Sequence, residues 1–352
     1  MRRTASLLTP LFCALAAILV PLHAAGRDDV RAVWVRHASI ESAEAVRRTI
    51  ASASTAGFNT LFVQVAGDTG AAAQFDPIAE TISQAHATGL RVHAWIDVAR
   101  VTVPGELPFA RTHVVYQHPE WLMVPRTIAA ELLSIDAKSP DYLGRIARWT
   151  RTNTDRADGL YISPLQPGAA AYLANEVREL VRHYPFDGVY FDHVQYPADD
   201  FDYGAMSMAA FRDAMRRDLP LAERQRIDAI EAIDPFAYPN ELADQWRLFR
   251  RSQLTALIAR LRSTVKEVRP DAVVSAAVTP DAGVAERDHL QDWRTWAENH
   301  FIDALCPVFA SGTPTQIADQ VAQVSALAAG LPVWVAAGPS PTALTRAAVK
   351  TP

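Results

Sequence analysis

Residues 76–98 read DPIAETISQAHATGLRVHAWIDV, and this stretch decides the fold. Its first part, 76–88, has the spacing of apolar residues expected of an amphipathic helix, and Gly89 stands where a left-handed C-cap is needed. Its second part, 91–98, alternates aliphatic with polar or aromatic residues and predicts a β-strand. A helix followed directly by a strand is the repeating unit of α/β folds with a parallel sheet.

The same alternation extends along the chain on both sides. Further strands are predicted at 32–36, 59–65, 188–192, 272–278, 302–308 and 332–336, and further helices at 41–56, 169–183, 241–268, 288–299 and 315–328. Two long excursions, 101–158 and 196–239, interrupt this rhythm. The pattern predicts a (β/α)8 barrel of the TIM type that lacks, or diverges at, its eighth strand. Three explanations stay open: residues 159–163 supply a strand, the chain is clipped, or the barrel is open.

The N-terminus has the three parts of a secretory signal peptide. Arg2 and Arg3 precede an apolar run at 7–20, and small residues follow before a polar stretch. The run is shorter than the ~20 apolar residues that a membrane-spanning helix needs. We therefore predict a signal peptide at 1–25, a single barrel domain at 26–352, no stable membrane span after cleavage, and a secreted or periplasmic location.

Charge and cysteine content exclude several classes of function. The chain has 352 residues and a formal net charge of −5, without a basic stripe that would bind nucleic acid. Only Cys306 remains once the signal peptide is removed, so the mature chain can form neither an internal disulfide nor a zinc site of paired cysteines.

The predicted strands carry polar residues at their carboxyl ends. Side chains of a strand alternate between two faces, and barrel chemistry lies where the strands end. The side chains predicted to converge there are Arg36, Gln64, His93, Asp97, Asp192 and Asp281. Each also has an ordinary structural alternative, such as a rim salt bridge, a hydrogen bond to a loop, a buried core histidine or a turn cap.

Several motifs carry a resemblance to one family. They are DGVYFDHVQYP at 187–197, RAVWVR at 31–36, FNTLFVQV at 58–65, HPEWLMVP at 118–125, QDWRTW at 291–296 and IDALCP at 302–307. Together they resemble the glycosyl-hydrolase-like family 10 barrels (the DUF187 group), over about residues 31–335. The resemblance implies an exported bacterial barrel that acts on glycan, with cell-wall glycan strands or similar polysaccharides as substrates of some members.

Glycoside hydrolysis needs a carboxylic acid and, opposite it, a carboxylate or the acetamido group of the substrate. Asp192 ends the strand of the strongest motif, so it is predicted to be the nucleophile or electrostatic stabiliser. Asp281 is the first candidate for its partner, and Asp97 the second. The predicted substrate-binding residues are Arg36, Gln64, His93, Trp95, Asp97, His193, Tyr196 and Trp293. Of these, Trp95, Tyr196 and Trp293 offer flat surfaces for sugar rings, with burial in the core as the alternative.

Other functions stay open beside the hydrolase. The segment 64–68 leads almost directly to 75–77, where the family carries a longer loop with an arginine, and this favours an inactive barrel that only binds glycan. A second carboxylate within reach of Asp192 would distinguish the two. A glycan lyase or a deacetylase is a third class. His93, Asp97, Asp192 and His193 are possible metal ligands, but without paired-histidine spacing we predict no metal and no cofactor. The predicted partner is a poly- or oligosaccharide.

Overall fold

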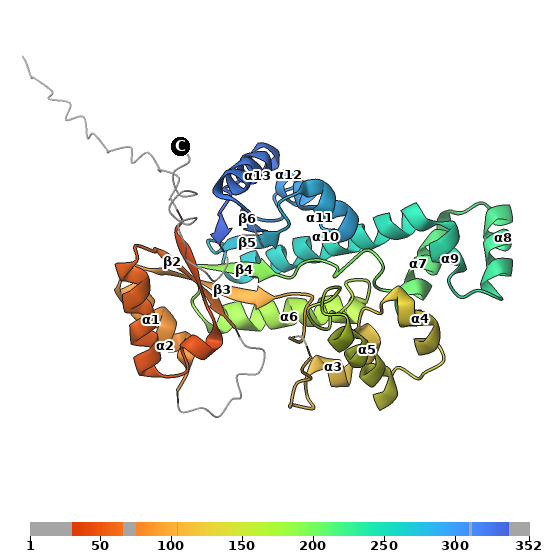
Figure 1. Cartoon of the computed structure of the whole chain (residues 1–352), viewed down its shortest axis with the longest axis horizontal. Helices are drawn as coiled ribbons and strands as arrows, with labels where there is room; N and C mark the ends of the chain where they lie inside the picture. The colour runs from red at the N-terminus through yellow and green to blue at the C-terminus, as the bar shows by residue number, and fades with distance from the viewer. Residues whose placement is uncertain (1–29, 66–74, 104, 310–311, 338–352) are drawn as a thin grey trace, which may run out of the picture. The chain divides into compact units, whose positions relative to one another are not determined.

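Parallel strands in chain order form the centre of the protein. The computed structural model describes residues 30–65, 75–103, 105–309 and 312–337. Its strands are β1 (Ala32–Val35), β2 (Thr60–Gln64), β3 (Arg91–Asp97), β4 (Gly188–Asp192), β5 (Val273–Val278), β6 (Ala304–Phe309) and β7 (Ala336–Ala337). Each strand pairs in parallel with the next one along the chain. Strands β1 to β6 form a curled half-barrel, and the short β7 lies beside β6 (Figure 1).

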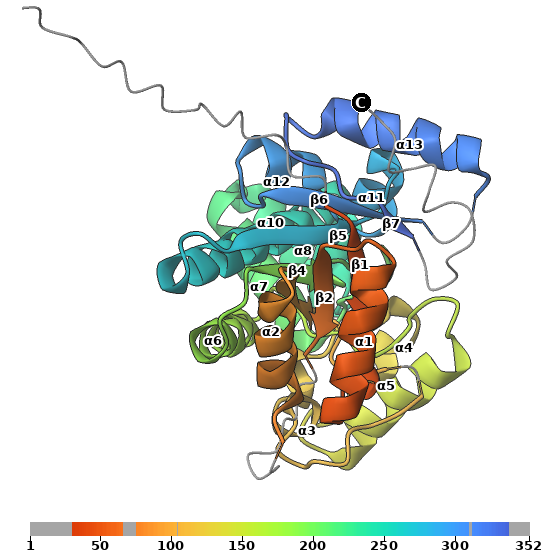
Figure 2. The ribbon, with the colours of Figure 1, turned by 90° about the vertical axis from the view of Figure 1, so that its left-hand side faces the viewer.

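The helices between consecutive strands lie around the outside of the half-barrel (Figure 2). They are η1 (His37–Ser39), α1 (Ala43–Thr55), α2 (Pro77–Ala87), α6 (Pro167–His183), α10 (Ala243–Val268), α11 (Ala282–Asp288), α12 (Trp293–Glu298) and α13 (Pro314–Leu327). Local sequence sets where they begin. The carboxylate of Asp76, for example, accepts the N–H groups of Ile78 and Ala79 at the start of α2.

The two faces of the sheet differ as the alternation predicts. The outer face packs apolar side chains under the helices, among them Leu61, Val63, Val92, Ala94, Val189 and Phe191. The inner face carries a separate aromatic cluster of Phe62 and Tyr190 with Trp34, Trp95 and Trp334 beside them. The rings of Phe62 and Tyr190 are stacked with centroids 4.6 Å apart. This side-chain alternation directs the polar residues at the strand ends toward the inside.

The predicted (β/α)8 barrel, lacking or diverging at its eighth strand, is confirmed only as a curled half-barrel of parallel strands. Within the described ranges, β1 and β7 are the two edges of the sheet. Residues 159–163 do not supply a barrel strand, because β3 pairs directly with β4. Instead Tyr161 and Ile162 form antiparallel bridges with Arg100 and Leu122. An eighth strand after residue 337, like the predicted signal peptide at 1–25, falls outside the residues that the structure describes.

The two excursions form small helical groups beyond the carboxyl ends of β3 and β4, at the right of Figure 1. The first excursion holds α3 (Val114–Gln117), η2 (Pro119–Trp121), α4 (Arg126–Leu132) and α5 (Pro140–Thr152). The second holds α7 (Ala205–Asp218), α8 (Leu221–Glu231) and α9 (Ala237–Glu241). Both therefore lie on the side of the sheet where the predicted site residues end their strands.

The close packing inside the half-barrel can be tested at Gly188, the first residue of β4. A Cβ atom there would lie 2.6 Å from the backbone oxygen of Val273 and 2.7 Å from the ring of His93. We expect Gly188→Ala to lower the free energy of unfolding in urea by about 2 kcal/mol, through overpacking. Gly144 in α5 is the control, since nothing lies within 4 Å of its Cβ position. Gly144→Ala should stabilise by up to ~1 kcal/mol, and equal effects of the two variants would contradict the packing described.

Candidate functional site

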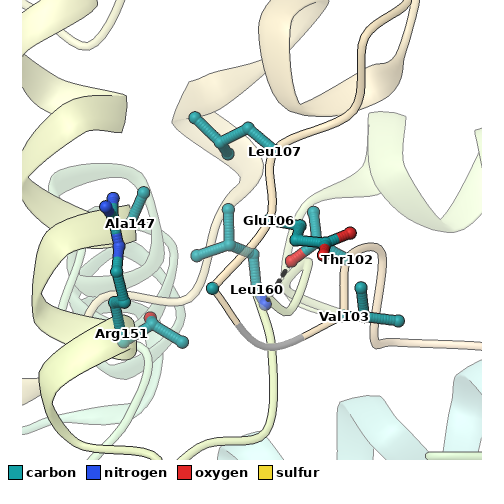
Figure 3. A pocket seen from close by; sticks show the side chains of 9 residues that line it. Thr102, Val103, Glu106, Leu107, Ala147, Arg151 and Leu160 are labelled. Atoms are coloured by element: carbon teal, nitrogen blue, oxygen red, sulfur yellow. Dashed lines mark hydrogen bonds between the residues drawn. The ribbon is translucent and has the colours of Figure 1, made fainter.

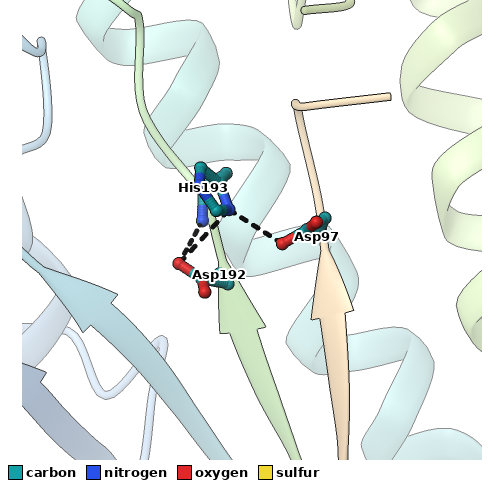
Figure 4. Close-up of side chains that lie close together, drawn as sticks. All are labelled: Asp97, Asp192 and His193. Atoms are coloured by element: carbon teal, nitrogen blue, oxygen red, sulfur yellow. Dashed lines mark hydrogen bonds and ion pairs between the residues drawn. The ribbon is translucent and has the colours of Figure 1, made fainter. Parts of the chain in front are cut away.

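Two aspartates face each other at the carboxyl ends of neighbouring strands. Asp97 ends β3 and Asp192 ends β4, and the register of the parallel ladder pairs these two residues directly. Figure 4 shows the two carboxylates on either side of the His193 ring. Their position follows from the sequence, because each is the last residue of a strand whose alternation directs it inward.

His193 links the two aspartates. Its Nδ1 atom lies 2.8 Å from Oδ1 of Asp97 and 3.4 Å from Oδ1 of Asp192. Its backbone N–H donates to the same oxygen of Asp192 at 2.8 Å. The residue has φ of +50°, which is uncommon for a residue other than glycine. Such strained backbone persists only where the surroundings hold it, and it often marks functional sites.

Arg100, which follows β3, and Asp158, which lies at the end of the first excursion, complete the charged cluster around His193. Arg100 donates to Oδ2 of Asp97 at 2.8 Å and to Oδ2 of Asp158 at 2.8 Å. Asp158 lies 3.3 Å from Nε2 of His193 and accepts the hydroxyl of Tyr161 at 2.6 Å. The antiparallel bridge between Arg100 and Tyr161 holds these groups side by side.

Asp192 differs from Asp97 and Asp158 because no arginine or lysine of the described residues forms an ion pair with it. Its Oδ2 accepts the indole N–H of Trp95 at 3.0 Å, and its side chain is 18% exposed. Burial raises the pKa of Asp192 above its ordinary value, and the positive charge of His193 only partly offsets this effect. Asp192 is thus the carboxyl of this cluster that most readily keeps a proton.

The environment of Asp97 lowers the pKa of its carboxyl, whereas that of Asp192 raises it. Burial disfavours its charge, but the hydrogen bond from His193 and the charges of His193 and Arg100 outweigh burial and lower the pKa of Asp97. For His193, burial disfavours the cation, but the hydrogen bonds to Asp158 and Asp97 raise the pKa of the imidazole to about 9. Two neighbouring carboxyls with pKa values pushed in opposite directions are the usual arrangement of an acid and an ionised partner.

Three of the predicted binding residues lie toward the carboxyl ends of the strands and have side-chain surface accessible to a ligand. Trp95 is partly exposed and touches Asp192 through its indole N–H. Gln64 ends β2 opposite Trp95 in the register. Arg36 follows β1 and is exposed, and its side chain makes neither a hydrogen bond nor an ion pair to any other described residue. The strand ends therefore bring together Gln64, Trp95, Asp97 and Asp192 as the sequence predicts.

The burial of three other predicted residues does not fit contact with a sugar. Tyr196 is fully buried and donates its hydroxyl to Asp202 at 3.1 Å. Trp293 is 1% exposed and donates its indole N–H to the backbone of Thr279. The prediction that these two rings stack on sugars is therefore corrected to a role in the core. His93 is 2% exposed and packs against Phe62, and burial lowers its pKa to about 4, which fits a neutral core histidine.

Asp281, the first predicted partner of Asp192, caps a helix. Its exposed carboxylate accepts the N–H of Val284 at 2.9 Å at the start of α11. The hydrogen bonds and ion pairs described around Asp192 involve Trp95 and His193 and do not include Asp281. Sequence reasoning missed Asp158 and Arg100. Neither belongs to a strand end, and the turn-like stretch 158–159 gives no signal of its own.

The cluster has the donor types of a metal site but is already ion-paired. Asp97, Asp192 and His193 each offer one ligand atom, and these atoms lie within 4.8 Å of one another. A histidine must be neutral to bind a metal. Here both ring nitrogens face carboxylate oxygens, which is the arrangement of a protonated ring. We therefore describe the three residues as an ion-paired cluster and assign them no metal.

A small hollow at the start of the first excursion is not a sugar site. Figure 3 shows it between Thr102, Leu160 and Arg151, where the N–H of Leu160 donates to the Thr102 hydroxyl at 2.9 Å. Its volume is about 10 Å³, which holds about one water molecule. The exposed groups around Asp192 are thus the better place for a sugar.

The raised pKa of His193 predicts how stability depends on pH. The unfolded imidazole titrates near 6.5 and the folded one near 9. The stabilisation is therefore complete below pH 6.5 and is lost as the pH rises through 9, by an amount on the order of 3 kcal/mol. Urea unfolding from pH 6 to 9.5 measures this loss. His193→Gln should be less stable than the wild type at pH 6, and its free energy of unfolding should change little up to pH 9. A decline with pH equal to that of the wild type would contradict the assignment.

Comparison with known proteins identifies the family. Residues 66–330 match the family model described as Glycosyl hydrolase-like 10. The chain belongs to this family. The match confirms the resemblance predicted from the sequence motifs. Within the family, the chain is 23% identical over 252 residues to glycosyl hydrolase DigH of Escherichia coli K12, covering 66% of this chain and 46% of DigH. It is also 23% identical over 252 residues to glycosyl hydrolase YngK of Bacillus subtilis 168, covering 66% of this chain and 38% of YngK.

The chain spans less than half the length of these curated relatives. Among solved structures, it is similar to the PgaB (BpsB) glycoside hydrolase domain from Bordetella bronchiseptica. The TM-score is 0.52 at 17% identity, over 86% of this chain and 81% of that chain. It is also similar to a β-galactosidase from Marinomonas ef1, with a TM-score of 0.58 at 10% identity, over 86% of this chain and 47% of that chain. At these identities the likeness establishes the fold, which is that of glycoside hydrolases.

Proposed function

We propose that this protein hydrolyses O-glycosidic bonds of a bacterial polysaccharide or cell-wall glycan, with Asp192 as its central catalytic carboxyl. The observation that carries the proposal is the contrast between Asp192 and Asp97. They lie opposite each other at the strand ends, and their surroundings shift their pKa values in opposite directions. Glycoside hydrolysis uses two carboxyl groups in such different states. Membership of the glycosyl hydrolase-like 10 family supports the same reaction class.

The surroundings of Asp192 favour the proton donor over the nucleophile that the sequence suggests. A buried carboxyl with a raised pKa keeps its proton until a leaving oxygen needs it. Asp97 stays ionised between His193 and Arg100, so its negative charge would stabilise a positively charged transition state. Between the two predicted partners, Asp97 is preferred, because Asp281 caps α11.

The site also offers groups that would hold a sugar. The partly exposed Trp95 fixes Asp192 and would present an apolar surface to a sugar ring. Arg36 and Gln64 make no side-chain hydrogen bond to any described residue, so their donors are open to hydroxyl groups. These residues form the proposed binding surface. Tyr196, Trp293 and His93 are left out because they are buried.

One observation favours a second function, an inactive protein that binds glycan. Each oxygen of Asp97 and of Asp158 already accepts a charged or hydroxyl donor. Among the described carboxyls of the cluster, Asp192 is then the one that accepts no hydrogen bond from a charged side chain, and a hydrolase of the usual kind needs two working groups. Without a second working carboxylate, the same exposed surface would bind glycan and not cut it.

One experiment decides between the two functions. The wild type and Asp192→Asn, matched for folding by circular dichroism, are incubated with peptide-free peptidoglycan and a panel of bacterial polysaccharides. Soluble sugar released by the wild type alone supports the hydrolase. No release from any substrate, with both proteins still retained on the insoluble glycan, supports the binding protein. Failure to hydrolyse and to bind would contradict both.

We also infer that the protein is exported. The segment 1–25 has the composition of a signal peptide, although it lies outside the described residues. None of the helices in the described ranges has the length and apolar character needed to cross a bilayer. A mature chain that begins near residue 25, measured by mass spectrometry on protein recovered outside the cytoplasm, would support export. A full-length mass there would contradict cleavage.

A further inference from the structure

Asp158 is the carboxylate of the charged cluster that does not end a strand. It lies in the first excursion, and its two oxygens contact three different groups. Oδ1 accepts the Tyr161 hydroxyl at 2.6 Å. Oδ2 accepts from Arg100 at 2.8 Å and lies 3.3 Å from Nε2 of His193. Asp158 therefore connects the excursion to the residue that follows Asp192.

The ring of His193 has a carboxylate at each nitrogen. Asp97 faces Nδ1 from β3, and Asp158 faces Nε2 from the excursion. An imidazole donates from both nitrogens only when it is protonated, so a carboxylate at each nitrogen favours the cation. The other groups that face the ring are Asp192 of β4 and Tyr161, whose ring lies edge-on with centroids 6.3 Å apart. Arg100, the second cation, contacts the same two carboxylates, Asp97 and Asp158.

This arrangement fixes what His193 does beside Asp192. A ring that donates from both nitrogens has no lone pair, so it cannot take a proton from an attacking water. It instead places a fixed positive charge 3.4 Å from Oδ1 of Asp192. The backbone N–H of His193 donates to this same oxygen at 2.8 Å. The orientation of Asp192 thus depends on the ring being held.

We propose that Asp158 is a positioning residue. Together with Asp97 it contacts the two ring nitrogens of His193, and it thereby sets the orientation and the charge environment of Asp192. The proposal rests on the proposed function, in which Asp192 donates the proton. Asp158 acts through His193 and not on the substrate. It connects the first excursion, an addition to a plain barrel, to the catalytic residue Asp192 at the end of β4.

The test uses Asp158→Asn, which keeps the shape of the side chain and one of its two acceptor oxygens but removes its charge. Asp155→Asn is the matched control, because Asp155 is exposed on the same loop and no interaction of its side chain is described. Asp158→Glu is the conservative variant that restores the charge. The first readout is the NMR titration of the His193 imidazole in full-length protein, assigned with His193→Gln. The second is the pH profile of glycan hydrolysis.

We expect Asp158→Asn to lower the titration midpoint of His193 by about one pH unit or more, because an opposite charge at this distance shifts a pKa by about one to three units. With the cation weakened, the pKa of Asp192 rises and the alkaline limit of kcat/KM moves to higher pH. We expect kcat to fall about tenfold with KM within about twofold, and Asp158→Glu to recover most of it. Asp155→Asn should match the wild type in both readouts.

Two results would overturn the proposal. An unchanged His193 titration in Asp158→Asn would show that Asp158 does not hold the ring, whatever the activity. A shifted titration with an unmoved pH profile and an even loss of rate would reduce Asp158 to a residue that only maintains structure. If the wild type hydrolyses no glycan, the proposed function fails, and the NMR titration still decides whether Asp158 grips His193.

Discussion

Asp192→Asn is expected to lower kcat/KM for the best glycan substrate by roughly 1000-fold, within the range by which a positioned acid accelerates such reactions. The amide keeps one acceptor oxygen, so it retains one of the two hydrogen bonds that Trp95 and the backbone N–H of His193 donate to the two oxygens of Asp192. It has no proton to give to a leaving oxygen. Because the shape of the side chain is preserved, KM should change little, and the loss should appear in kcat.

The measurement is the initial rate of soluble sugar release from whichever substrate of the panel the wild type cuts. Asp271→Asn serves as the control, since Asp271 is exposed and precedes β5 at the opposite end of the strands. Its activity should equal that of the wild type. If Asp192→Asn keeps more than about a tenth of the activity, Asp192 is not the proton donor.

Two further variants distinguish the partner carboxylate in the same assay. Asp97→Asn should lose activity on a scale similar to Asp192→Asn, because it removes the negative charge between His193 and Arg100. Asp281→Asn should stay near wild type, because asparagine caps a helix about as well as aspartate. The reverse ranking would restore Asp281 as the partner that the sequence favours.

The strand ends could be predicted from sequence because two simple rules apply to them. Alternation within a strand decides which side chains face inward, and parallel strands end at one edge. These rules place Gln64, Trp95, Asp97 and Asp192 together, and the register pairs Asp97 with Asp192. The closing of the barrel could not be predicted in this way, because alternation within a strand does not specify how many strands pair in the sheet.

The other residues of the site could not be predicted from the sequence. Either tertiary contacts bring them to the site, or their residue type serves both structural and functional roles. Asp158 reaches His193 only because an antiparallel bridge brings Tyr161 beside Arg100. These two residues are 61 positions apart in the chain. Tyr196 and Trp293 belong to a residue type that serves cores as well as sugar sites, and both are buried. Asp281 likewise has a side chain that suits both catalysis and helix caps, and its place before α11 makes it a cap.

The loop that follows His193 is anchored by an arginine in α10, and the largest change in stability is expected there. Arg250 is 2% exposed and donates from Nη1 to the backbone oxygens of Asp199 and Phe201, and from Nη2 to the carboxylate of Asp199. Its guanidinium also lies over the ring of Trp246, 4.8 Å from the centroid. Arg250→Met would leave the buried carbonyl of Phe201 and the partly buried carbonyl of Asp199 without this donor and should lower the free energy of unfolding by about 3 to 5 kcal/mol.

Urea unfolding of Arg250→Met and Arg260→Met measures this effect against a matched control. Arg260 lies in the same helix, is exposed, and has no described ion pair, so its variant should lie within about 0.5 kcal/mol of wild type. Since the anchored loop begins at His193, any folded Arg250→Met should also lose hydrolysis under conditions where Arg260→Met keeps it. A stable Arg250→Met with full activity would mean that neither the loop nor the orientation of His193 depends on this anchor.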